Sequence, residues 1–179
     1  MALAAPAGLI ADPPPPISAL TAAMIQLGDT PQAFDQASGF VFLSSDTWTE
    51  DRQAQLATSL ARHPRPLVVC NPDIASPGGD MLNAEPGFYA HRIAGEMDIV
   101  PIFCGKPGAP IYRTALARAG NVAPERVLCV GDTLQTDILG ARAAGCRAML
   151  VEDGFCAGRD ALALAAECGI WPDFVAPGL

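Results

Sequence analysis

The sequence predicts an α/β fold built around a largely parallel β-sheet. Short apolar runs recur along the chain, and segments long enough for helices of about ten residues separate them. Glycine, proline and Asn-Pro or Gly-Asp pairs stand at the ends of these segments, as is typical of turns. Because 50% of the 179 residues are hydrophobic, the chain can bury a substantial core.

The elements are predicted in order along the chain. The first 38 residues show no regular pattern of elements. Pro13–Pro16 indicate a stiff connector, and residues 17–27 indicate a short helix with Ser18 as its N-cap. From residue 39 the alternation is regular. We expect strands over 39–43, 67–70, 99–104, 127–130 and 148–151, and helices over 50–62 (capped by Thr49), 86–96, 110–120 and 136–145.

Charge and composition exclude several classes of function. The net charge is −8, and the 11 basic residues are scattered, which disfavours binding to nucleic acid. No apolar stretch approaches the ~20 residues of a membrane span, and the N-terminus lacks the basic region of a secretion signal. The six cysteines show no CxxC spacing and are interpreted as free thiols. We therefore expect a cytoplasmic protein.

Two aspartates carry the strongest chemical signal. Asp132 stands at the carboxyl end of a predicted strand, where open α/β sheets bind ligands, and Gly131 allows a tight turn there. Asp137 follows in the first turn of the next helix. Carboxylates arranged in this way can hold Mg²⁺, although the same spacing also suits a turn cap and a helix-dipole partner.

Two further signals also follow predicted strands. Lys106, between Gly105 and Pro107, is placed to reach a phosphate or a group of carboxylates. By itself it equally fits a solvated loop lysine, and no Walker motif surrounds it. Asn71 and Asp73 enclose a proline, and alone they indicate only a turn.

Together and in this order, the segments 67–73, 101–116 and 127–145 resemble the haloacid dehalogenase (HAD) superfamily, and most closely its subfamily IIA of 4-nitrophenylphosphatase-like proteins. The resemblance extends from about residue 39 to residue 160. It implies a portion of a C2-type cap over 39–98 and the C-terminal part of a HAD-like Rossmannoid core over 99–179, and it leaves 1–38 as a poorly defined N-terminal segment. It also implies Mg²⁺-dependent hydrolysis of a small phosphate ester.

The resemblance assigns roles to the five polar residues. Asp132 would ligate Mg²⁺, and Asp137 would support that acidic cluster. Lys106 would neutralise the phosphoryl oxygens and the charge of the nucleophile. Asn71 and Asp73 would lie in the cap, near the leaving group of the substrate.

The sequence departs from the family pattern at the nucleophile. Family members begin with a strand that ends in DxDG or DxWG, followed by a strand that ends in Ser/Thr-Asn, and residues 1–38 contain neither. Asp46, with Trp48 two residues later, imitates DxW, but the glycine is missing and residues 39–73 are better read as cap. A truncated gene or a mis-set start codon would account for the gap.

Three interpretations follow. The chain is a phosphatase, impaired or inactive alone; or it is a non-catalytic remnant that binds a ligand or partner; or it is a receiver domain, which the absence of an early acidic pair disfavours. We also expect the strand over 127–130 to have an unpaired edge, leading to self-association, or a substitute neighbour from residues 1–38.

Overall fold

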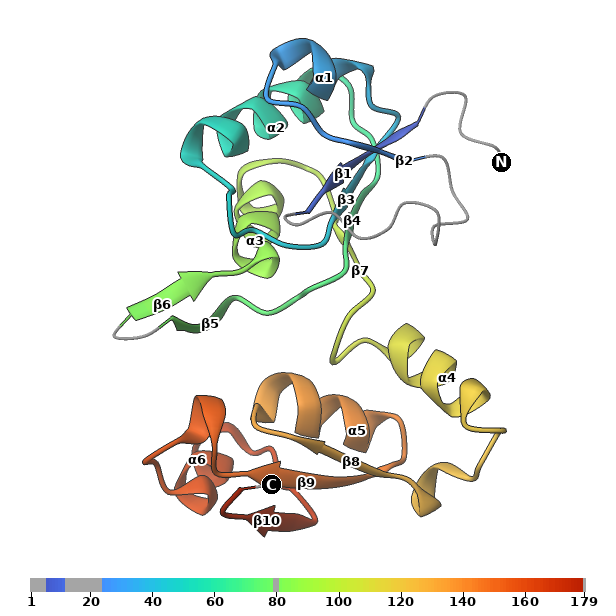
Figure 1. The fold of residues 1–179 in the computed structure, drawn as a ribbon, viewed down its shortest axis with the longest axis vertical. Coiled ribbons are helices and arrows are strands. Elements are labelled where there is room, and N and C mark those ends of the chain that lie inside the picture. Colours follow the sequence, from blue (N-terminus) through green and yellow to red (C-terminus); the bar gives the residue numbers. More distant parts are fainter. Residues whose placement is uncertain (1–5, 12–23, 79–80, 179) are drawn as a thin grey trace. The chain divides into compact units, whose positions relative to one another are not determined.

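A computed structural model describes residues 6–11, 24–78 and 81–178. The chain divides into two compact units (Figure 1). Of the described residues, unit 1 comprises 6–11, 24–75 and 83–103, and unit 2 comprises 76–78, 81–82 and 104–178. The sequence placed its division between residues 98 and 99, whereas the last crossing between the units falls after Phe103.

Unit 1 contains a five-stranded parallel sheet in the order β2-β1-β3-β4-β7. Three helices of this unit share a single core cluster with Phe42 of β3 and Val69 of β4. The strands are β1 (Ala7–Ile10), β2 (Met24–Gln26), β3 (Phe40–Phe42), β4 (Leu67–Val69) and β7 (Ile102–Phe103), and the helices are α1 (Pro31–Gln36), α2 (Glu50–Arg62) and α3 (Pro86–Glu96).

Unit 2 contains a three-stranded parallel sheet in the order β10-β9-β8. Its strands are β8 (Leu128–Gly131), β9 (Arg147–Val151) and β10 (Phe174–Ala176), and its helices are α4 (Ala109–Arg118), α5 (Leu139–Ala143) and α6 (Ala161–Cys168). A π-helical turn over Leu134–Ile138 leads into α5. Ile138, Ala148 and Leu150 are fully buried in the core of this unit. The residues of a hairpin, β5 (Ala75–Gly78) and β6 (Met81–Ala84), are divided between the two units.

The α/β prediction is confirmed, and several boundaries follow the local signals. Helix α2 begins after Thr49, whose side chain accepts a hydrogen bond from the Arg52 backbone N–H, and α3 covers the predicted residues. The correction concerns the N-terminal region. Residues 24–26 form a strand and not the end of a helix, and residues 12–23 lie outside the described residues. The described strands form two parallel sheets, one in each unit, and the two-stranded β5-β6 hairpin.

Strand β1 bears on the expectation that residues 1–38 supply a neighbour for the strand predicted over 127–130. Residues 7–10 do supply a strand, but it pairs with β2 and β3 of unit 1 and not with β8. All four of its residues are buried in this position. In the described ranges, no helix is long and apolar enough to cross a membrane.

Candidate active site

Asp132 lies directly after β8, at the carboxyl edge of the parallel sheet of unit 2. Its Oδ2 accepts a hydrogen bond of 2.8 Å from the backbone N–H of Phe155, and its Oδ1 accepts one of 3.3 Å from the Thr133 hydroxyl. Gly154 adopts a φ of +60°, and a Cβ there would overlap the Asp132 carboxylate. The loop after β9 is therefore shaped to hold this carboxylate in place.

Asp137 lies in the π-helical turn and is buried. Its Oδ1 is 2.5 Å from Nζ of Lys106, and its Oδ2 accepts a hydrogen bond of 3.2 Å from the Thr133 backbone N–H. A side chain at position 131 would overlap the Asp137 carboxyl group, so Gly131 is required for this close approach. π-Helical turns of this kind occur frequently at functional sites.

Lys106 is the only lysine of the chain. Its side chain is 44% exposed, compared with 11% for that of Asp137. The amine is thus anchored on one side by a buried carboxylate and remains open to solvent on the other. An ammonium group in this setting can meet an anionic ligand without losing its own counter-charge.

Tyr112 of α4 is a site residue that sequence reasoning missed. Its hydroxyl lies 3.3 Å from the carbonyl oxygen of Thr136 and 3.2 Å from that of Asp137, so it donates to the backbone of the π-helical turn. Its ring occupies the space that a side chain at Gly140 would need. Burial, together with the charge of Asp137, raises the pKa of Tyr112 to about 12. In the sequence, Tyr112 looks like any core residue of a helix, so its hydrogen bonds to the π-helical turn could not be predicted.

These side chains fit Mg²⁺ in kind but supply few ligands. Asp132 and Asp137 offer the hard carboxylate oxygens that Mg²⁺ prefers. Asp137, however, is already neutralised by Lys106. Across the described ranges, no group of three or more His, Cys, Asp or Glu side chains is arranged to hold a metal ion. Of the two carboxylates, Asp132 is therefore the one that could hold a metal ion directly.

Asn71 and Asp73 lie in unit 1, after β4. The Asn71 side chain accepts a hydrogen bond of 3.2 Å from the Asp73 backbone N–H and donates one of 2.9 Å to Oε2 of Glu85. Gly87 permits the close approach of this loop, because a Cβ there would overlap the carbonyl group of Pro72. The structure thus pairs Lys106 with Asp137 in unit 2, where Asp132 is held by the loop after β9. It forms a separate ordered turn from Asn71 and Asp73 in unit 1.

Asp46 and Trp48, which imitate a nucleophile motif, follow β3 of unit 1. Asp46 is exposed in a turn. Trp48 is buried: its ring centroid lies 4.8 Å from that of Phe42, and its Nε1 donates to Oε1 of Gln53. The tryptophan is therefore explained by core packing.

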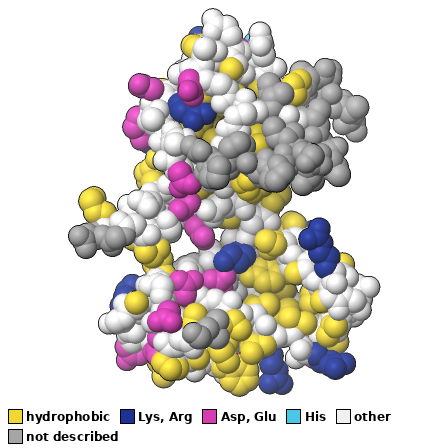
Figure 2. Space-filling view, in the orientation of Figure 1, with side chains coloured by type: hydrophobic (Ala, Val, Ile, Leu, Met, Phe, Trp, Pro, Cys, Tyr) yellow, Lys and Arg dark blue, Asp and Glu magenta, His cyan; other side chains and the backbone are white. Residues whose placement is uncertain are grey.

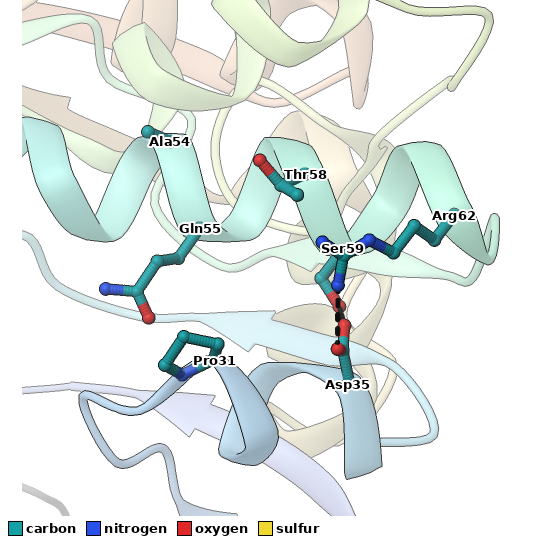
Figure 3. A pocket seen from close by; sticks show the side chains of 7 residues that line it. All are labelled: Pro31, Asp35, Ala54, Gln55, Thr58, Ser59 and Arg62. Atoms are coloured by element: carbon teal, nitrogen blue, oxygen red, sulfur yellow. Dashed lines mark hydrogen bonds and ion pairs between the residues drawn. The ribbon is translucent and has the colours of Figure 1, made fainter.

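A cavity of about 210 Å³ lies between α1 and α2 of unit 1 (Figure 3). There the Asp35 carboxylate accepts hydrogen bonds from Ser59 (2.6 Å) and Arg62 (3.1 Å), which lowers its pKa. Gln55 also lines this cavity, and its Oε1 is buried without a partner among the described residues. None of the five predicted site residues lines this cavity.

The C-terminal part of the chain matches a known family model. Residues 103–179 match the family model described as HAD-hydrolase-like. Over these residues the chain is similar to the HAD-like hydrolases. The sequence resemblance to the HAD superfamily is thereby confirmed, and the 4-nitrophenylphosphatase-type fold of subfamily IIA is found among the solved structures similar to the chain.

Three similar proteins show the extent of the similarity. Phosphoserine phosphatase from Thermus thermophilus is 47% identical over 62 residues, which are 35% of this chain and 22% of that protein. The structure of a possible sugar phosphatase of the HAD superfamily from Cytophaga hutchinsonii matches with a TM-score of 0.79 at 21% identity, over 98% of this chain and 66% of that one. The p-nitrophenyl phosphatase from Archaeoglobus fulgidus matches with a TM-score of 0.70 at 23% identity, over 81% of this chain and 55% of that one.

The chain therefore spans 55% and 66% of the length of these two solved structures, and 22% of the length of the phosphoserine phosphatase.

Proposed function

We propose that this HAD-like chain belongs to a Mg²⁺-dependent phosphatase that acts on a small phosphate ester, with unit 2 binding the phosphoryl group and the metal. The observation that carries the proposal is the Lys106–Asp137 pair, in which Nζ and Oδ1 lie 2.5 Å apart. Asp137 lies in the turn that follows Asp132 at the end of β8. Unit 1 corresponds to the cap in this proposal, and unit 2 to the C-terminal part of the core.

Each residue has a distinct task in the proposed chemistry. Lys106 binds a non-bridging phosphoryl oxygen and offsets the negative charge that grows on it during transfer. Asp137 holds the lysine amine in place, and Thr133 fixes the orientation of that carboxylate through its backbone N–H. Asp132 would hold Mg²⁺, which supplies charge neutralisation at the phosphoryl oxygens when bound. Asn71 and Asp73 contact the remainder of the substrate.

Residues 1–179 by themselves are proposed to bind and not to turn over. Lys106, Asp132 and Asp137 can position and neutralise a phosphoryl group, but in these roles none of them accepts it covalently. This second function, ligand binding without catalysis, is favoured by the engagement of both carboxylates: Asp137 is paired with Lys106, and Asp132 accepts the Phe155 backbone N–H.

The single lysine makes a direct test feasible. Reductive methylation with ¹³C-formaldehyde labels Lys106 and the N-terminal amine, so NMR follows two signals. We expect the Lys106 signal to shift on titration with inorganic phosphate in the presence of Mg²⁺, and to shift much less in Asp132→Asn. The N-terminal signal is the internal control. Equal responses of the two signals would show non-specific binding and would rule out the proposed site.

A further inference from the structure

The cavity between α1 and α2 of unit 1 contains a buried polar atom without a partner. Gln55 of α2 lines this cavity, and its Oε1 makes no hydrogen bond with the described residues. Pro31 of α1 lines the same cavity but lacks a backbone N–H that could serve as the donor. A buried acceptor without a donor is costly, so such an atom in a folded protein requires an explanation. A ligand that donates a hydrogen bond to Gln55 would provide one.

A charged group lies on the other side of the cavity from the Gln55 amide (Figure 3). Ser59 follows Gln55 by four residues, which corresponds to about 6 Å along α2. Its hydroxyl donates to Oδ1 of Asp35 (2.6 Å) and accepts a hydrogen bond from Nη2 of Arg65 (2.6 Å). Arg62 donates to Oδ2 of the same carboxylate through Nη1, and its side chain is 59% exposed, so the rest of its guanidinium group is open to a ligand. Two arginines thus surround one carboxylate, and this side of the cavity is locally positive.

The size of the cavity and the charge of the protein limit the choice of ligand. The volume of about 210 Å³ is below the roughly 300–1,000 Å³ of pockets for drug-sized molecules. Pro31 and Ala54 offer apolar surface in the same cavity. The net charge of the chain is −8, and Figure 2 shows Asp and Glu side chains on the visible faces of both units. This charge would repel a ligand that is negative overall, but not a zwitterion.

We propose that this cavity binds a short zwitterionic amino acid, whose ammonium group donates to Gln55 and whose carboxylate is bound by Arg62. The methylene groups between the two charged ends lie against Pro31 and Ala54. An ω-amino acid such as 4-aminobutanoate fits, because its charged ends are separated by about one turn of helix. The site does not depend on the proposed function, since the residues that line it belong to unit 1 and none of them has a role in the proposed phosphoryl or metal chemistry.

NMR of the ¹⁵N-labelled full chain tests the site with three probes. We expect 4-aminobutanoate to cause saturable shifts of the backbone N–H signals of Asp35, Gln55 and Arg62, while the signals of unit 2 stay unchanged. Butanoate lacks the ammonium group and butylamine lacks the carboxylate, so each should bind at least tenfold more weakly. Equal binding of all three probes, or no saturable shift with 4-aminobutanoate, would overturn the proposal.

Two variants and a matched control assign the contacts. Gln55→Met and Arg62→Met should each weaken the binding of 4-aminobutanoate at least tenfold. Gln36→Met should leave it unchanged, because Gln36 is an exposed residue of α1 outside the cavity. A loss of binding in all three variants would contradict the assigned contacts.

Urea unfolding without any probe gives a second readout for Gln55. The midpoint should rise in Gln55→Met, since this variant removes an unpaired buried acceptor and keeps a side chain of similar length. The control Gln36→Met should leave the midpoint unchanged. A midpoint that stays the same or falls in Gln55→Met would mean that Oε1 is already hydrogen-bonded in the protein without a ligand, and the proposal would then be wrong.

Discussion

The hydroxyl of Tyr112 lies 3.2 Å from the backbone carbonyl oxygen of Asp137. It connects α4, which begins three residues after Lys106, to the π-helical turn that carries the carboxylate partner of that lysine. One buried phenol thus joins the two segments from which the Lys106–Asp137 pair is built.

Removing this hydroxyl should loosen the connection without creating a large cavity. We expect Tyr112→Phe to lower the free energy of unfolding by about 1 kcal/mol, because a neutral hydrogen bond to a buried carbonyl group is lost. Urea unfolding measures the change. Gly140→Ala should cost more, since a Cβ there would overlap the Tyr112 ring, and the combination with Tyr112→Phe should not relieve it. An unchanged midpoint for Tyr112→Phe would show that the hydrogen bond does not contribute.

The raised pKa of Tyr112 predicts a loss of stability in alkali. Burial raises this pKa from 10.0 to about 12 in the folded chain. The unfolded state then releases the phenolic proton first, so the contribution to stability is complete below pH 10 and is lost as the pH rises toward 12. Unfolding measured from about pH 9 to about pH 12 should show this decline, and Tyr112→Phe should make it shallower. A decline of the same slope in the variant would assign the effect to other groups.

Mg²⁺ should bind weakly to residues 1–179. Asp132 is half-buried and accepts a backbone hydrogen bond, while Asp137 is neutralised by Lys106, so few anionic oxygens remain for a metal that gives up its water reluctantly. We expect a dissociation constant in the millimolar range, on the order of −4 kcal/mol. Calorimetry with wild type and Asp132→Ala makes the measurement. Micromolar affinity that Asp132→Ala abolishes would contradict it.

The sequence predicted the elements whose signals are local. Helix α2 was located by Thr49 and by the proline after its end, and β8 by an apolar run that stops at Gly131 and Asp132. Strand β2 was missed because residues 24–26 continue an apolar pattern that also suits a helix, and their pairing with β1 is not visible locally. For short apolar runs of this kind, tertiary pairing decides the structure.

The candidate site shows the same limit. The spacing of Asp132 and Asp137 predicted that they follow one strand closely, and the structure adds that Asp137 pairs with Lys106. Asp137 was expected in a regular first turn of a helix. It lies instead in a π-helical turn, where its carboxyl group closely approaches Gly131. The contributions of Tyr112 and of the Phe155 backbone N–H depend on packing between distant segments, which a single sequence does not reveal.

Catalysis provides the sharpest test of the proposed function. Lys106, Asp132 and Asp137 can hold and neutralise a phosphoryl group, but a covalent catalyst without its nucleophile loses several orders of magnitude in rate, with about 10³–10⁴ over the uncatalysed reaction remaining. We therefore expect no measurable hydrolysis of 4-nitrophenyl phosphate by purified residues 1–179 with Mg²⁺.

Asp46→Asn is the decisive control, because Asp46 alone imitates a nucleophile strand in sequence, while the structure places it in an exposed turn of unit 1. Turnover by the wild type that Asp46→Asn eliminates would make Asp46 the nucleophile and the assignment of unit 1 as a cap wrong. Turnover that Asp46→Asn leaves intact but Lys106→Met removes would instead place catalysis in unit 2 without the covalent step expected of the family.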